Sequence, residues 1–398
     1  MLADVIEALS SSDLAWPVVI ALAWVGGELA HRWASLPRVS SYGLVGFACA
    51  STQLGLLPVA GAGPGMLVAN IAFGLILFEF GYRINLRWLL TNPWLGASGL
   101  LEAGVTFACV YALARWTGAP TLTALLLASL SMSTSPAAVM RVINEQRSSG
   151  QVTERVLHLA ALNCILAVFA FKVVVGFWTF DTSGHLWSAV SNSVVVLVAS
   201  AGLGAAFGVG VPALLRRLGR LNQDATVALA VAVILLVAIT HALRFSPLLA
   251  ALTFGFVVRH RRVTLSQAQR NFGALGDLLA VVLFVYIATT LSWPRVVDGL
   301  ALGLALVAVR SAAKVISVTA LARASGTSWR KGALTGLAMT PISVFVILLL
   351  EHTRYLGIDL IDQLAPLAAA TLVLEILGPI VMQQALRWAG ETHDPKEP

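Results

Sequence analysis

Apolar runs long enough to cross a membrane follow one another along almost the whole chain, with short polar connections between them. A helix that crosses the hydrocarbon core needs about 20 predominantly apolar residues. The pattern therefore predicts a polytopic helical membrane protein. The thirteen predicted spans cover residues 14–31, 39–57, 66–82, 95–114, 121–146, 153–179, 187–210, 224–242, 246–258, 272–291, 299–322, 331–350 and 364–386.

Composition supports the same class. The chain is 58% hydrophobic and 11% charged, whereas soluble proteins carry roughly 25% charged residues. A soluble domain of this composition would have too little polar surface, so a soluble protein is excluded. We expect one all-α transmembrane domain over residues 1–390 and a short cytoplasmic tail at 391–398. Because so few residues follow the last span, no nucleotide-binding module is expected there.

The basic residues test the order of the spans, because short cytoplasmic loops are enriched in lysine and arginine. When alternate loops are assigned to opposite sides, 19 of the 26 basic residues fall on one side and four on the other, with three inside spans. This asymmetry predicts an N-terminus outside and a C-terminus in the cytoplasm, in the inner or plasma membrane. The net charge of +7 thus reflects topology, and no nucleic-acid partner is expected.

Two spans, the fifth and the twelfth, contain a proline preceded by small hydroxyl residues. Proline removes a backbone donor and interrupts a helix. The two spans are predicted to run in opposite directions, and corresponding broken helices in two inverted halves indicate a secondary transporter with its site near the midplane. The halves would cover roughly 39–210 and 246–387; the alternative is two unrelated kinks. The stretches are "SLSMSTSPAAVMRV" and "GLAMTPISVFVI".

Charged residues inside spans are costly and usually face a cavity or a partner. Arg310 and Lys314 lie one turn apart in the eleventh span, and the alternative to a functional role is that they reach the interface. Glu102 lies deep in its span, while Glu79 could pair with Arg83 four residues later. Further acids within the spans are Glu28, Asp277 and Glu375.

Nothing in the sequence indicates an enzyme, a cofactor or a metal site. The three cysteines all lie in apolar runs, so neither a disulfide framework nor a metal-binding spacing is present. His158 and Cys164 are six residues apart, which places them on different faces of one helix. A Cys–His nucleophile is therefore not expected.

Several segments resemble, in order and spacing, the motifs of the monovalent cation/proton antiporter superfamily of bacterial sodium/proton and potassium/proton exchangers. The resemblance covers nearly the whole chain. The thirteen-helix members of this superfamily have broken helices as their fifth and twelfth helices. The similar segments are "LPRVSSYGLVG", "LILFEFGYRINLRWL", "STSPAAVMRVINEQ" with "ERVLHLAALNCILAV", "VRSAAKVISVTALARASGTSWRKGAL" and "LVLEILGPIVMQQAL".

The resemblance implies an ion site. Asn163 matches the first residue of the acidic pair on the sixth helix, and Lys314, or alternatively Arg310, matches the basic residue that faces it. The second residue of the pair, an aspartate in the family, is Cys164 here, and the aspartate of the first broken helix is Ser135. The implied ion- or substrate-binding residues are Thr134, Ser135, Asn163, Cys164, Arg310, Lys314 and Thr340.

The Asn163–Cys164 pair lacks the charge that ordinary exchange needs. An asparagine does not titrate, and a thiol, with an ordinary pKa of about 8.5, is mostly neutral near pH 7. The basic side of the site would then have no acid opposite it. We therefore consider three hypotheses: a Na⁺ or K⁺/proton antiporter in which Glu102 or Glu79 carries the proton, an anion or organic-solute transporter of the same fold, and a transport-inactive sensing or partner-binding relative. The resemblance also implies a homodimer embedded in membrane lipid.

Overall fold

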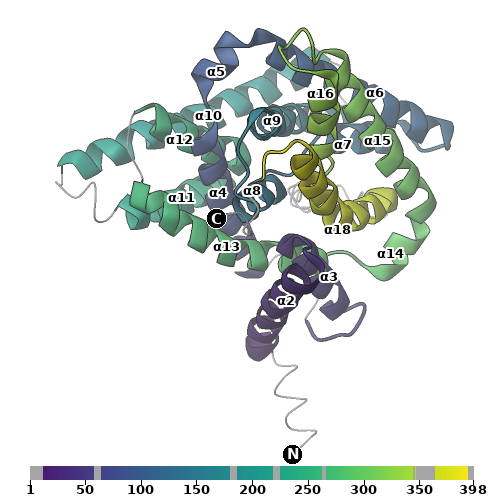
Figure 1. Ribbon diagram of the computed structural model, residues 1–398, viewed down its shortest axis with the longest axis horizontal. Helices are drawn as coiled ribbons and strands as arrows, with labels where there is room; N and C mark the ends of the chain where they lie inside the picture. The colour runs from purple at the N-terminus through teal and green to yellow at the C-terminus, as the bar shows by residue number, and fades with distance from the viewer. Residues whose placement is uncertain are drawn as a thin grey trace, which may run out of the picture.

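The computed structural model describes residues 12–57, 64–179, 186–217, 225–261, 266–343, 346 and 364–392. Within this part of the chain, the regular secondary structure is entirely α-helical (Figure 1). Eight of the helices are long and apolar enough to cross a membrane, and three shorter apolar helices accompany them. The protein is therefore an all-α, multi-pass membrane protein, as the sequence predicted.

The helices form two bundles according to which helices pack on one another. Figure 1 shows α10–α13 on the left and α6, α15, α16 and α18 on the right. The first bundle contains α2 (Ser12–Ala34), α3 (Arg38–Cys49), α4 (Pro64–Arg83), α10 (Leu186–Arg217), α11 (Ala225–Ala242), α12 (Pro247–His260) and α13 (Ser266–Thr289). The second contains α6 (Pro93–Trp116), α7 (Thr121–Ser131), α8 (Pro136–Glu145), α9 (Gln151–Thr179), α15 (Leu300–Ala320), α16 (Trp329–Ala338) and α18 (Ala365–Trp388). Two short helices, α5 (Leu86–Thr91) and α14 (Trp293–Asp298), lie in connections.

Most predicted spans coincide with a helix to within a few residues, and the largest error concerns residues 39–57. Helix α3 ends at Cys49, and the apolar residues after it form turns. Gly55 adopts a φ of +69°, and its amide donates to the Ala50 carbonyl at 2.9 Å. A hydropathy pattern does not register such a turn, because the residues in it stay apolar. The pattern also missed α5 and α14 and ended the seventh span at residue 210, whereas α10 continues to Arg217.

The fifth span is broken at its proline. Helix α7 ends at Ser131 and α8 begins at Pro136, whose missing N–H is harmless in the first turn of a helix. The Ser135 side chain caps α8 by accepting from the Ala138 amide at 3.2 Å. This capping gives the first turn of α8 an acceptor for an amide that the break would otherwise leave without one.

The twelfth span is also interrupted, because α16 ends at Ala338 and Met339–Ser343 are not helical. The Ser135 amide donates to the Pro341 carbonyl at 3.0 Å, which joins the two interruptions at one point. Most of the second half of this span lies outside the described residues. The total of thirteen helices and the inverted repeat consequently stay predictions.

Two glycines permit the close packing that positions the interruptions. A Cβ at Gly336 of α16 would lie 2.6 Å from the Cα of Val315 on α15, and a Cβ at Gly378 of α18 would lie 2.8 Å from the Cα of Pro341. Real Cβ atoms do not approach that closely. Helix α18 therefore lies directly against the second interruption, and α15 lies against the end of α16 just before it.

Candidate functional site

Arg310 holds the two interruptions together. Its Nε and Nη2 donate to the carbonyls of Ser131 at 2.8 Å and Ser133 at 2.6 Å in the first interruption. Its Nη1 and Nη2 donate to the carbonyls of Thr340 at 2.6 Å and Pro341 at 3.3 Å in the second. These carbonyls lack helical partners because the helices end there. The buried guanidinium thus donates hydrogen bonds to free carbonyls at the ends of both broken helices.

Lys314, one turn after Arg310 on α15, forms a buried ion pair with Glu102 of α6. Its Nζ lies 2.5 Å from the Glu102 Oε1, and neither side chain is exposed. The same Nζ donates to the Met132 carbonyl at 3.1 Å and to the Thr134 hydroxyl at 3.3 Å. The Thr106 hydroxyl also donates to the Glu102 Oε1, at 3.2 Å. The pair therefore joins α6 and α15 at the first interruption.

This arrangement corrects the expectation that the basic side of the site has no acid opposite it. The acid comes from α6 rather than from the Asn163–Cys164 pair of α9. Sequence reasoning identified Glu102 as a deep carboxyl but did not place it beside Lys314. The contact with the Met132 carbonyl was missed entirely, because a backbone atom released by a helix break leaves no mark on residue type.

Thr134 connects this ion pair with Asn163 and Cys164. The Asn163 Nδ2 donates to the Thr134 hydroxyl at 3.4 Å, and the Cys164 thiol donates to the Thr134 carbonyl at 3.1 Å. The Thr134 hydroxyl itself donates to the Met339 carbonyl at 3.3 Å. Four of the residues singled out from the sequence, namely Thr134, Asn163, Cys164 and Lys314, are thus brought together.

Two buried oxygen atoms of this network have no hydrogen-bond partner among the described residues: Oε2 of Glu102 and Oδ1 of Asn163. Buried polar atoms are nearly always partnered, so each exception calls for an explanation. Carboxylate, amide and hydroxyl oxygens are the ligands that hard cations prefer. These atoms are therefore candidates for binding a cation.

Three predicted ligands have other roles in this conformation. The Ser135 hydroxyl oxygen caps α8, and the Thr340 hydroxyl donates to the Leu337 carbonyl at the end of α16. The Arg310 guanidinium likewise donates its hydrogen bonds to backbone carbonyls. These three side chains shape the site rather than line it with free atoms.

Glu79 lies in a different cluster, near the end of α4. Its Oε2 lies 3.0 Å from the Arg141 Nη2, and its Oε1 lies 3.5 Å from the Arg83 Nη2, the pairing that the four-residue spacing predicted. Arg141 also forms an ion pair with Asp277 of α13, and Asn144 donates to the Glu79 Oε1 at 3.3 Å. The cluster joins α8 of the second bundle to α4 and α13 of the first. Lys314 is not among its members.

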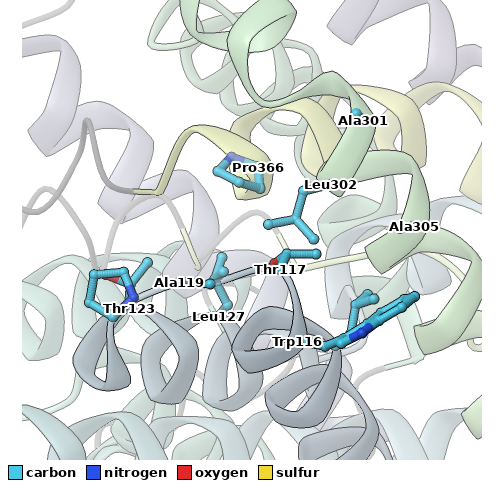
Figure 2. A pocket seen from close by; sticks show the side chains of 12 residues that line it. Trp116, Thr117, Ala119, Thr123, Leu127, Ala301, Leu302, Ala305 and Pro366 are labelled. Carbon is cyan, nitrogen blue, oxygen red and sulfur yellow. The ribbon is translucent and has the colours of Figure 1, made fainter.

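A cavity of about 650 Å³ opens beyond the ends of α6 and α7, away from the ion pair. Figure 2 shows Trp116, Thr117 and Leu302 around it, with Pro366 of α18 above. Its nearest residue on α15, Ala305, precedes Lys314 by nine residues, or roughly 14 Å of helix. The lining is mostly apolar, so the cavity offers no oxygen cage for an ion.

Comparisons with known proteins agree with this architecture. The family model described as "Sodium/hydrogen exchanger, transmembrane" matches residues 18–388. The chain is similar to the structure of the sodium proton antiporter MjNhaP1 from Methanocaldococcus jannaschii at pH 8, with a TM-score of 0.68, 15% identity, and coverage of 94% of this chain and 96% of that one. An electron-microscopy structure of MjNhaP1 gives a TM-score of 0.67, 18% identity, and coverage of 93% and 95%. A comparison with curated protein sequences finds no significant match.

Proposed function

Because the chain belongs to the sodium/hydrogen exchanger family, we propose that it exchanges a monovalent cation, Na⁺ or K⁺, for protons, and that Glu102 is the carboxyl that carries the proton. The observation that supports this proposal is the buried pair of Glu102 and Lys314 beside two free oxygens, Glu102 Oε2 and Asn163 Oδ1. The pair supplies the titrating group that Asn163 and Cys164 lack.

The chemistry of exchange follows from competition for one carboxylate. With Lys314 bound, the charge of Glu102 is balanced and no net charge is buried. A cation that binds Glu102 Oε2 and Asn163 Oδ1 needs the ionised carboxylate, so the O–H bond of protonated Glu102 breaks, its electron pair stays on the carboxylate and water accepts the proton. A returning proton binds the Glu102 carboxylate again and displaces the cation. The site therefore holds either the cation or the proton, which is the requirement for coupled exchange.

Alternating access would come from motion of one bundle against the other, the usual mode in transporters with broken helices. The site residues Glu102, Thr134, Asn163 and Lys314 all belong to the second bundle. Such a motion would carry the site as a unit, with Arg310 keeping the two interruptions joined. We place the N-terminus outside, the C-terminus in the cytoplasm and the protein in the inner membrane as a homodimer, following the distribution of basic residues and the family resemblance.

The geometry argues against the anion-transport hypothesis. An anion site needs a free cationic group, whereas Arg310 donates to four backbone carbonyls and Lys314 is paired with Glu102. Binding an anion there would require breaking either arrangement. The transport-inactive hypothesis makes the opposite prediction in a flux measurement and is decided by it.

The test is cation-dependent proton flux in liposomes containing purified protein and an imposed pH gradient. We expect flux with Na⁺ or K⁺ for the unchanged protein, and loss of flux for Glu102→Gln, which keeps the size of the side chain but cannot titrate. Glu79→Gln is the matched control, since it removes another buried carboxyl that lies outside the site and should keep flux. Absence of flux with Na⁺, K⁺ and Li⁺ from mildly acidic to mildly alkaline pH would contradict the proposal.

A further inference from the structure

Glu375 of α18 is a buried carboxyl that the proposed exchange mechanism does not use. Its side chain is 5% exposed, and neither carboxyl oxygen has a hydrogen-bond partner among the described residues. The Thr371 hydroxyl, one turn earlier on the same helix, also lacks a partner there. An unpartnered carboxylate in such a place is very costly. The group is therefore stable in this conformation as the neutral acid.

The helices around α18 bring no counter-charge to Glu375. Helices α3, α8, α14, α15 and α16 pack against α18. Arg310 is held by carbonyls of the two interruptions, Lys314 is paired with Glu102, and Arg141 binds Glu79 and Asp277. None of the titratable or charged side chains of these five helices forms a hydrogen bond or ion pair with Glu375 in the described structure: Arg38, Tyr42 and Cys49 of α3, Arg141 and Glu145 of α8, Arg295 and Asp298 of α14, Arg310 and Lys314 of α15, and Arg330 and Lys331 of α16.

Glu375 lies at the contact between the two bundles. A Cβ at Gly43 of α3 would be 2.9 Å from the Glu375 Oε1, so the carboxyl presses against the backbone of the first bundle. Beside it, the Ser40 hydroxyl of α3 donates to the Ile376 carbonyl of α18 at 2.7 Å. Gly378, one turn later, lies against Pro341 of the second interruption. The carboxyl therefore sits at the depth of the broken helices, on the surface along which the bundles would move.

We propose that Glu375 is a second proton-binding site of the exchanger, protonated while α18 packs against Gly43 and deprotonated when movement of the bundles exposes it to water. The O–H bond of the carboxylic acid breaks, its electron pair stays on the carboxylate, and water accepts the proton. This step rests on the proposed function for its role in transport. It adds one proton per cycle to the proton carried at Glu102.

The first experiment detects the acid itself and does not depend on transport. Infrared difference spectra between acidic and alkaline pH, recorded on the purified full chain in lipid, report the carbonyl stretch of a protonated buried carboxyl. We expect a band that is lost at alkaline pH, is absent in Glu375→Gln and is retained in Glu102→Gln. A band that persists in Glu375→Gln, or the absence of any titrating band, would overturn the proposal.

The second experiment measures the number of protons moved per cation in liposomes, from the cation gradient that balances a fixed pH gradient at zero membrane potential, so that net flux vanishes. Glu375→Gln mimics the neutral acid in shape, so the variant should fold and exchange, with the ratio lowered by one proton. An unchanged ratio would show that Glu375 stays protonated throughout and would overturn the proposal. If the unchanged protein shows no coupled flux, the proposed function fails, and the infrared measurement still decides whether Glu375 titrates.

Discussion

The Nζ of Lys314 lies 2.5 Å from the Oε1 of Glu102, and both side chains are completely buried between α15 and α6. The two residues are 212 positions apart in the sequence. Bringing two charges out of water costs free energy that their attraction only partly returns, but removing one partner leaves the other buried without compensation. The pair is thus suited to exchange, since a cation or a proton that binds Glu102 can balance its charge in place of Lys314.

The first prediction concerns the stability of this pair. Lys314→Met alone strands the Glu102 carboxylate and should lower the free energy of unfolding by about 3–5 kcal/mol, and Glu102→Gln alone should lower it similarly. The double variant carries no charge at either of these two positions and should lose much less than the sum. Thermal unfolding of the four proteins in one detergent gives the coupling energy. Additive losses would show that the two side chains do not interact in the membrane protein.

Arg310 should be irreplaceable even by lysine. Its planar guanidinium reaches carbonyls in both interruptions, and a lysine ammonium cannot reproduce that fork. Each hydrogen bond to a charged group contributes about 1.5–3 kcal/mol, so Arg310→Lys should lower the melting temperature and abolish proton flux. The control is Arg323→Lys, at an exposed arginine that lies over the Trp329 ring. An Arg310→Lys protein with normal melting and flux would contradict the role assigned to Arg310.

The sequence predicted the class, most helices and part of the site for a physical reason. Hydrophobic length and proline position are local properties, so the spans and the interruption at Pro136 can be recognised without knowing how helices pack. Family spacing then placed Asn163 and Lys314 near the break. The location of Glu102 opposite Lys314 depends on the rotation of α6 about its axis, and that helix has no strongly polar face to indicate it. The turn at residues 50–57 was not predicted for a related reason: its side chains are as apolar as those of a helix.

Glu79 provides the third prediction, since the sequence alone indicated it, beside Glu102, as a candidate proton carrier. Its Oε2 accepts from Arg141 and its Oε1 from Asn144, and the single amide oxygen of a glutamine can keep one of these two hydrogen bonds. Glu79→Gln should therefore keep cation-dependent proton flux, while the weaker link between α4 and α8 changes the rate of the conformational step. Flux assays on this variant and on Glu102→Gln in parallel separate the two carboxyls. Complete loss of flux in a folded Glu79→Gln protein would show that Glu79 is needed for exchange and would contradict this prediction.

Glu391 provides the fourth prediction, because it caps the helix that carries Asn163 and Cys164. Its Oε1 and Oε2 accept from the amides of Val152 and Thr153, both at 2.9 Å, in the first turn of α9. Loss of such a cap costs about 0.5–2 kcal/mol, so Glu391→Ala should lower the melting temperature measurably. Glu154→Ala, at an exposed acid in the same turn, keeps the cap and should change the melting temperature less. Equal effects of the two substitutions would assign the loss to general electrostatics at the helix end.

The last prediction moves the carboxyl from α6 to α9. The Cys164 thiol donates to the Thr134 carbonyl, and the Thr134 hydroxyl accepts from Lys314 at 3.3 Å. Cys164 and Lys314 therefore share Thr134 as a hydrogen-bond partner. Glu102→Gln should abolish proton flux, and adding Cys164→Asp to it should restore part of that flux, because a carboxylate at position 164 can again balance Lys314 and bind a cation beside Asn163. Cys164→Ser in the same background is the control, since it keeps a small polar side chain without a titrating group. Flux that returns only with the aspartate would establish that the site needs one carboxylate facing Lys314 and accepts it from either helix. If the double variant folds and stays silent, the position of the carboxyl on α6 is itself a requirement, and the exchange reaction depends on Glu102 Oε2 as well as on charge.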